Sequence, residues 1–131
     1  MADNAPTPES LLPLAPAVFH ILLTLTGEER HGYSIMHEVA EMTQGQMRLG
    51  PGTLYRSLKQ MLAASLITEA RERPDPAIDD ERRRYYRLTP FGHRVAEAEA
   101  LRLSRLVVQA RAKQLLPEDP AGQPGVLGGA Q

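Results

Sequence analysis

The 131-residue sequence contains no cysteine, no tryptophan and only two phenylalanines. The lack of cysteine excludes disulfides, thiol catalysis and zinc–thiolate sites, and it fits a reducing compartment. No stretch approaches the roughly 20 apolar residues that span a bilayer. The first residues also lack the basic start of a signal peptide. We therefore expect one cytoplasmic domain that does not contact a membrane.

Catalytic and metal-binding patterns are also missing. No two of the four histidines have HxxxH or HExxH spacing, and no carboxylate cluster completes a metal site. No phosphate-binding glycine loop and no Ser-His-Asp signature occurs. The sequence therefore predicts no catalytic residue, no metal, no cofactor and no enzymatic activity.

Charge is unevenly distributed, although the net charge is only -1. Residues 1–47 contain one basic residue, Arg30, and six acidic residues, whereas residues 48–113 contain 14 basic and eight acidic residues. The local field matters more than the total charge for binding phosphates. The basic excess is modest, which predicts weak sequence-independent binding to DNA by a single subunit.

Both ends of the chain are rich in residues that disfavour regular structure. Prolines recur within residues 1–13, which predicts a flexible N-terminal arm, and residues 117–131 combine proline with glycine, as in disordered tails. The folded part is therefore expected between Leu14 and Leu116.

Apolar residues at helical spacing predict three helices in the first half. The first begins near Ala15 and is apolar over much of its circumference, so it needs cover from a partner subunit as well as from its own domain. The second covers about residues 33–43. A short extended piece at residues 47–49 is expected to pair with a sheet edge. The third runs from Pro51 to about Ala64.

Two strands and a long helix complete the pattern. Residues 67–73 and 83–88 predict a basic β-hairpin, and Thr89-Pro90 is an N-cap followed by proline at the first helical position. The helix to about Leu116 would span roughly 40 Å at the usual rise per residue. Its wide apolar band indicates dimerisation. A helix that can enter a groove, followed by a basic hairpin, is the layout of a winged helix-turn-helix domain.

Three motifs appear in this order and are similar to a known family. They are His31-Gly32-Tyr33-Ser34-Ile35-Met36, Gly52-Thr53-Leu54-Tyr55-Arg56-Ser57-Leu58 and Tyr85-Tyr86-Arg87-Leu88-Thr89-Pro90-Phe91-Gly92. Over about residues 14–106 the chain resembles the PadR family of bacterial transcriptional regulators. The resemblance implies a winged-helix homodimer, usually a repressor, that binds a palindromic operator. It is closest to the compact members, which have a single helix after the wing.

The expected fold is therefore mainly α with a small β-hairpin. Residues 14–89 would form the winged helix-turn-helix DNA-binding domain, and residues 90–116 a long C-terminal dimerisation helix. The partners expected are double-stranded DNA and a second copy of the chain.

The third helix supplies most of the expected DNA-binding residues. Thr53, Arg56 and Lys59 lie on adjacent turns and can meet phosphates or base edges together. Tyr55 can donate its hydroxyl to a phosphate while its ring packs on the domain. On the hairpin, Arg83 and Arg84 are favoured because they lie together at its returning end. The alternative is an ordinary solvated surface on which nearby acidic residues balance the arginines.

The start of the second helix has two interpretations. Gly32 can supply the backbone freedom of a turn while Tyr33 packs, which we favour. Alternatively, Tyr33 or Ser34 holds a phosphate at the helix N-terminus, where free N–H groups point outward.

Apolar residues of the first and last helices are the candidates for the dimer interface: Phe19, Leu23, Leu103 and Val107. The same residues could line a pocket for a small apolar or aromatic effector, which the family resemblance allows. Dimer core is favoured, because the chain offers few aromatic side chains to stack on a ligand.

Two other functions remain open at this point. The acidic first third and the near-neutral total charge are compatible with a winged-helix module that binds another protein without sequence-specific DNA binding. A MarR-type winged helix is a second alternative, but it normally has more helix on both sides of the DNA-binding core.

Overall fold

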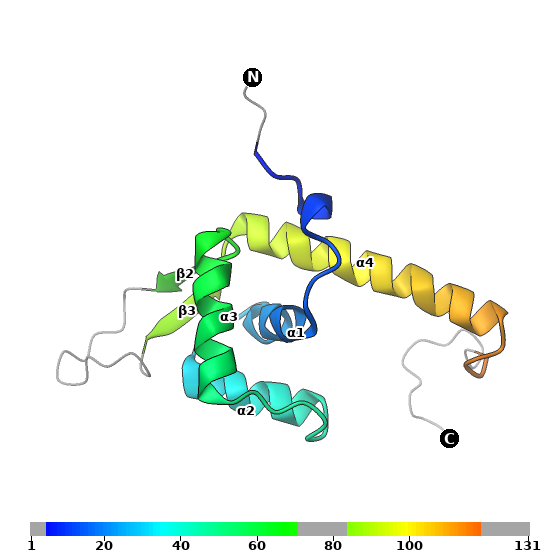
Figure 1. The fold of residues 1–131 in the computed structure, drawn as a ribbon, viewed down its shortest axis with the longest axis horizontal. Helices are drawn as coiled ribbons and strands as arrows, with labels where there is room; N and C mark the ends of the chain where they lie inside the picture. The colour runs from blue at the N-terminus through cyan, green and yellow to red at the C-terminus, as the bar shows by residue number, and fades with distance from the viewer. Residues whose placement is uncertain (1–4, 71–83, 119–131) are drawn as a thin grey trace. The chain divides into compact units, whose positions relative to one another are not determined.

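The computed structural model describes residues 5–70 and 84–118 (Figure 1). The chain divides into one unit that ends at Glu99 and another that begins at Ala100. The mainly α fold class, with a small β-sheet and a long C-terminal helix, agrees with the sequence analysis. The elements are η1 (Pro8–Leu11), α1 (Pro16–Leu25), β1 (Arg30–His31), α2 (Gly32–Met42), α3 (Pro51–Ala63), β2 (Ile67–Ala70), β3 (Tyr85–Leu88) and α4 (Pro90–Ala112).

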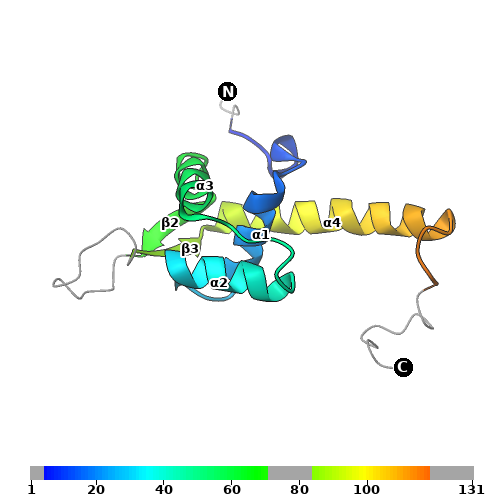
Figure 2. The same ribbon diagram turned by 60° about the horizontal axis from the view of Figure 1, so that its bottom comes forward.

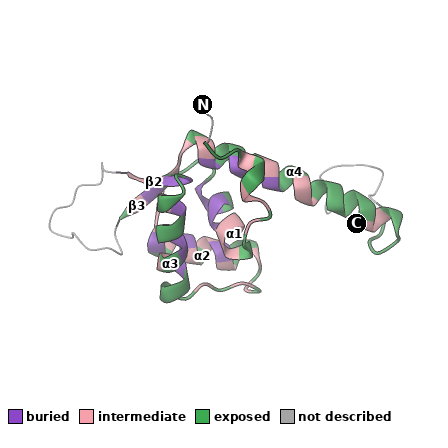
Figure 3. Cartoon of the chain, turned by 45° about the horizontal axis from the view of Figure 1, so that its top comes forward, coloured by how far each residue is buried: buried purple, intermediate pink, exposed green. Residues whose placement is uncertain are grey.

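Helix α1 is the centre of the first unit, where it contacts α2, α3 and β3 (Figure 1). Ile21, Leu22 and Leu25 on α1 are buried against Leu58 of α3 and Val95 of α4. Figure 3 shows how the buried residues gather on the facing sides of these elements. The wide apolar surface of α1 is thus largely used within its own subunit.

The sheet is antiparallel, with strand order β1-β3-β2. Tyr86 on the central strand lies opposite both Arg30 of β1 and Glu69 of β2. Tyr86 is buried whereas Arg87 is exposed, so neighbouring residues of β3 point to opposite faces of the sheet. Helix α3 and β2 contact one another, which places the helix beside the hairpin (Figure 2).

The prediction that residues 47–49 pair with the sheet edge is wrong. Within the described residues the third strand is Arg30–His31, which lies between the first two helices, where the sequence analysis expected no strand. The backbone N–H of Met47 instead donates to the hydroxyl of Thr43, at 3.0 Å, and Met47 and Leu49 pack against the core. The segment is therefore attached to the end of α2 and to the core.

Both ends of the folded part differ from the sequence analysis. Within the expected flexible arm, η1 forms with Thr7 as its N-cap, and Leu11 and Leu12 pack against the core. Helix α4 stops at Ala112, because Gln114 adopts a positive φ of 66° and the N–H of Leu115 bonds back to the carbonyl of Ala110 at 2.9 Å. The boundaries proposed for the arm, domain, helix and tail remain predictions.

The hairpin is joined to α4 by a compact capping arrangement. The hydroxyl of Thr89 donates to the carbonyl of Ser65, at 2.6 Å, and accepts from the N–H of Gly92, at 2.8 Å. Gly92 lies so close to the carbonyl of Leu66 that a Cβ there would overlap it. The start of α4 is therefore fixed against the turn between α3 and β2. None of the described helices combines the length and apolarity needed to cross a membrane.

Replacing Gly92 with alanine should lower the free energy of unfolding by about 3 kcal/mol, because the new methyl group must displace backbone. Gly52 is the matched control. It also follows a helix-starting proline within the first turn, but a Cβ there meets no described atom within 4 Å. Gly52→Ala should leave stability unchanged or raise it by up to about 1 kcal/mol. Urea unfolding of both variants measures the difference. Equal unfolding midpoints for the two variants would contradict the close approach of Gly92 to the backbone of Leu66.

Candidate nucleic-acid interface

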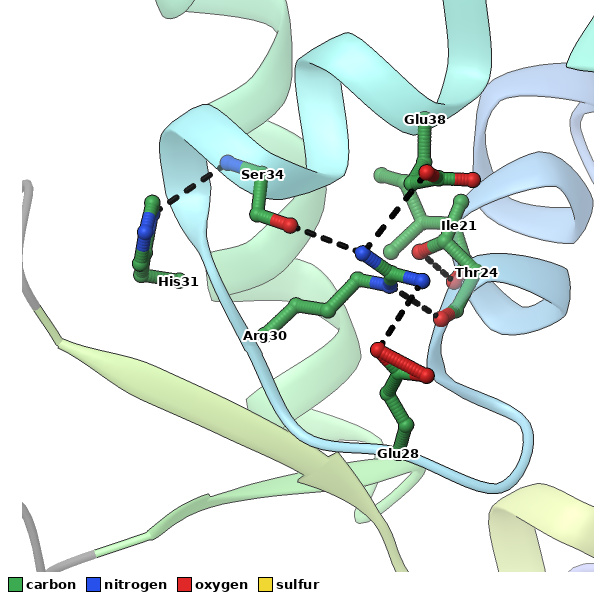
Figure 4. Close-up of polar contacts among 7 residues, drawn as sticks. All are labelled: Ile21, Thr24, Glu28, Arg30, His31, Ser34 and Glu38. Atoms are coloured by element: carbon green, nitrogen blue, oxygen red, sulfur yellow. Dashed lines mark hydrogen bonds and ion pairs between the residues drawn. The ribbon is translucent and has the colours of Figure 1, made fainter. Parts of the chain in front are cut away.

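The orientation of α2 is fixed by the guanidinium of Arg30, which lies between α1 and α2 (Figure 4). Its Nε donates to the carbonyl of Thr24 at 2.8 Å, and its Nη1 donates to the hydroxyl of Ser34 at 2.8 Å. Carboxylates of Glu28 and Glu38 lie 3.1 and 3.9 Å from its terminal nitrogens. We call these five residues the Arg30 cluster. Since the Arg30 side chain is only 18% exposed, these contacts are partly shielded from solvent.

His31 follows directly and caps α2. Its Nδ1 accepts a hydrogen bond from the backbone N–H of Ser34 at 3.2 Å, and its ring meets the edge of Tyr85 on β3, with 5.2 Å between centroids. His31 thus supplies the cap of this motif. The backbone freedom expected of Gly32 is not used, because Gly32 is the first residue of α2 and its φ is not positive. The side chain of Tyr33 is 51% exposed, so the prediction that it packs on the domain is wrong. Ser34 is occupied by the cap and by Arg30.

The outward face of α3 carries the predicted polar residues. Thr53, Arg56 and Lys59 are all exposed, whereas Leu54 and Leu58 are buried beneath them. The guanidinium of Arg56 reaches the hydroxyl of Thr53 at 3.5 Å. The amphipathic spacing of this helix thus places two cations and a hydroxyl together on solvent-facing turns.

Tyr55 has a different position from its neighbours. Its hydroxyl oxygen is buried, and it lies so close to Gly32 that a Cβ at that glycine would overlap it. A larger residue at position 32 would require the side chain of Tyr55 to shift. The ring therefore packs between the two helices, as expected, and a phosphate contact by its hydroxyl stays a prediction that would require the ring to move.

A groove of about 530 Å³ lies between α3 and the hairpin, and we call it the α3 groove. It is lined by Tyr55, Arg56, Leu58, Lys59, Leu62, Glu69, Arg84 and Tyr86. The structure therefore brings Arg84 of the hairpin together with Arg56 and Lys59 of α3. Three cations around one groove favour a polyanionic ligand.

The hairpin arginines are paired in this structure. Arg84 lies 3.3 Å from the carboxylate of Glu69, and Arg87 lies 3.5 Å from that of Glu29. The acidic residues that the sequence offered as the balance, Glu72, Asp75, Asp79, Asp80 and Glu81, lie outside the described residues. Arg83 lies outside the described residues, as do Arg71, Arg73 and Arg82.

The candidate dimer residues are only partly covered by their own subunit. In the first unit Leu23 is 41% exposed and Phe19 is half-buried; in the second, Val107 is 41% exposed and Leu103 half-buried. Leu106, which the sequence analysis did not select, is 53% exposed. Large exposed apolar side chains at one segment are typical of interaction surfaces.

Sequence analysis missed the roles of Arg30 and Glu69. Arg30 is the single basic residue among the first 47, which is a signal that it neutralises acidic neighbours. Glu69 was counted only as a residue of the hairpin, because its proximity to Arg84 depends on strand register.

Comparison with known proteins agrees with this geometry. Residues 21–98, more than half of the chain, match the transcriptional regulator PadR-like family. The chain belongs to this family. A PadR family transcription regulator from Clostridium difficile has 26% identical residues and a TM-score of 0.61, over 78% of this chain and 100% of that one. Membership of the family supports a role in transcription regulation through DNA binding.

The chain is also similar to two further proteins. RosR from H. salinarum shares the fold, with 24% identity and a TM-score of 0.57 over 85% of this chain and 97% of that one. An uncharacterized 37.1 kDa protein in transposon TN4556 of Streptomyces fradiae is 35% identical over 86 residues, or 66% of this chain. The chain spans only 22% of the length of that relative.

Replacing Arg30 with lysine should lower the free energy of unfolding by about 2 kcal/mol, because one ammonium cannot reproduce the forked contacts to Thr24, Ser34 and Glu28. Arg56→Lys is the matched control. Its guanidinium is exposed, so that variant should stay within about 0.5 kcal/mol of the parent. Chemical unfolding of both proteins measures the difference. Equal losses of stability would contradict the role given to the Arg30 cluster.

Proposed function

We propose that this chain is a homodimeric transcriptional repressor that binds a palindromic operator in double-stranded DNA. In this proposal α3 enters the major groove, where Thr53, Arg56 and Lys59 contact base edges and phosphates. Arg84 contacts the adjacent backbone from the hairpin. The observation that carries the proposal is the α3 groove, which joins exposed cations of both elements on one surface.

Dimerisation is proposed from the apolar surface on α4. Leu101, Leu106, Val107 and Val108 are all exposed in the second unit. A second copy that covers them would place two recognition helices about 34 Å apart, one turn of DNA. Two subunits would also double the basic surface offered to phosphates, which compensates for the near-neutral charge of one chain.

A small apolar or aromatic effector belongs to the same proposal, and we expect it to contact apolar side chains at the interface of the two subunits. We propose no enzymatic activity. The described residues contain no group of three or more metal-ligating side chains.

The double substitution Arg56→Ala and Lys59→Ala tests the proposal. It should reduce operator affinity at least a hundredfold, because each lost contact to a base or phosphate weakens the complex by about 1–3 kcal/mol. Fluorescence anisotropy with an operator selected from random DNA measures this. The double change Arg105→Ala and Lys113→Ala is the control, since it removes equal charge from exposed positions of the second unit.

Light scattering of the parent and both variants should give the mass of two chains. Normal operator binding by the Arg56 and Lys59 variant would contradict the assignment of α3. If the parent prefers no sequence in the selection and instead binds another protein, the interaction-module alternative holds.

A further inference from the structure

We propose that Glu69 is a positioning residue that acts through Arg84, holding its guanidinium in the α3 groove and thereby restraining contact with DNA phosphates. The inference rests on the proposed function. It assigns a role to the one acidic side chain in a groove otherwise lined by cations, tyrosines and leucines. In this proposal the carboxylate of Glu69 lowers the affinity for DNA. The effect is largest for non-operator DNA, which the protein binds through phosphate contacts alone.

The register of the hairpin places Glu69 toward α3. Glu69 lies opposite Tyr86, and Ile67 lies opposite Leu88. Since side chains on paired positions point to the same face of a sheet, Glu69 shares the face of the buried Tyr86. Both residues line the α3 groove. The carboxylate therefore faces the helix that carries Arg56 and Lys59, on the surface proposed to meet DNA.

The carboxylate is in contact with the cation nearest to it. The Oε2 of Glu69 accepts a hydrogen bond from Nη1 of Arg84 at 3.3 Å. Their side chains are 36% and 49% exposed, so the pair is weak and can open. A phosphate that binds Arg84 must replace this carboxylate or share the guanidinium with it. Either outcome leaves a negative charge facing the DNA, which opposes binding.

This arrangement affects sequence-independent binding most. Binding to random DNA depends almost entirely on phosphate contacts, and a regulator must avoid being held at the many non-operator sites of a genome. Base contacts by α3 give additional affinity at the operator. A restraint on Arg84 therefore lowers the background of non-operator binding, while contacts from α3 still select the operator.

The test is a double-mutant cycle on full-length protein with Glu69→Gln, Arg84→Gln and both together, measured by anisotropy with a random-sequence duplex over a salt series. Glu69→Gln should tighten binding by about two- to fivefold, the range expected for release of an exposed ion pair. The plot of log affinity against log salt should become steeper by up to about 0.9 per subunit. In the Arg84→Gln background, Glu69→Gln should have little effect.

Glu41→Gln is the matched control, since it removes the same charge from an exposed position on α2 that does not line the α3 groove. Thermal unfolding by circular dichroism verifies that all variants fold. A merely structural Glu69 predicts the opposite sign, because loss of its support for the hairpin would weaken binding.

Three results would overturn the inference. Unchanged or weaker binding by Glu69→Gln contradicts a restraint. If Glu69→Gln raises the affinity for DNA equally with Arg84 and with Arg84→Gln, or if Glu41→Gln raises it as much, then Glu69 only adds negative charge and does not act through Arg84. If the parent binds no DNA under any condition, the proposed function fails and the inference fails with it, whereas normal parental binding with an unaffected Glu69 variant leaves the proposed function standing.

Discussion

The guanidinium of Arg30 is the contact on which the arrangement of the helix-turn-helix depends. It joins the carbonyl end of α1, through Thr24, to the first turns of α2, through Ser34. The backbone of Arg30 lies in β1, opposite Tyr86 of the central strand. One residue thus connects both helices to the sheet, and the next, His31, caps α2 and contacts Tyr85. Gly32, which comes next, leaves room for the hydroxyl of Tyr55 where α2 lies beside α3.

The second constraint is the close approach at Gly92. There α4 begins against the backbone of Leu66, and the hydroxyl of Thr89 connects the last strand, the first turn of α4 and the turn after α3. The hairpin and the base of α4 are consequently fixed to the same end of α3.

Local patterns explain why so much of the fold was predictable. Proline at the first helical position and the apolar spacing of Leu54, Leu58 and Met61 correctly place α3, and Thr89-Pro90 correctly starts α4. The third strand was missed because Arg30–His31 is too short for any period-2 pattern, and its partner is distant in sequence. The outward face of α3 was predicted from periodicity. The pairing of Glu69 with Arg84 was not, because it depends on the register of two strands.

The central claim is that the cations around the α3 groove bind DNA in a sequence-dependent way. The most direct test is fluorescence anisotropy of the parent protein with its own upstream DNA and a scrambled duplex, repeated over a salt series. The account predicts a clear preference for one sequence, with affinity for both duplexes falling steeply as salt rises. Equal affinities that do not change with salt would contradict it, because phosphate contacts by Arg56, Lys59 and Arg84 require that dependence.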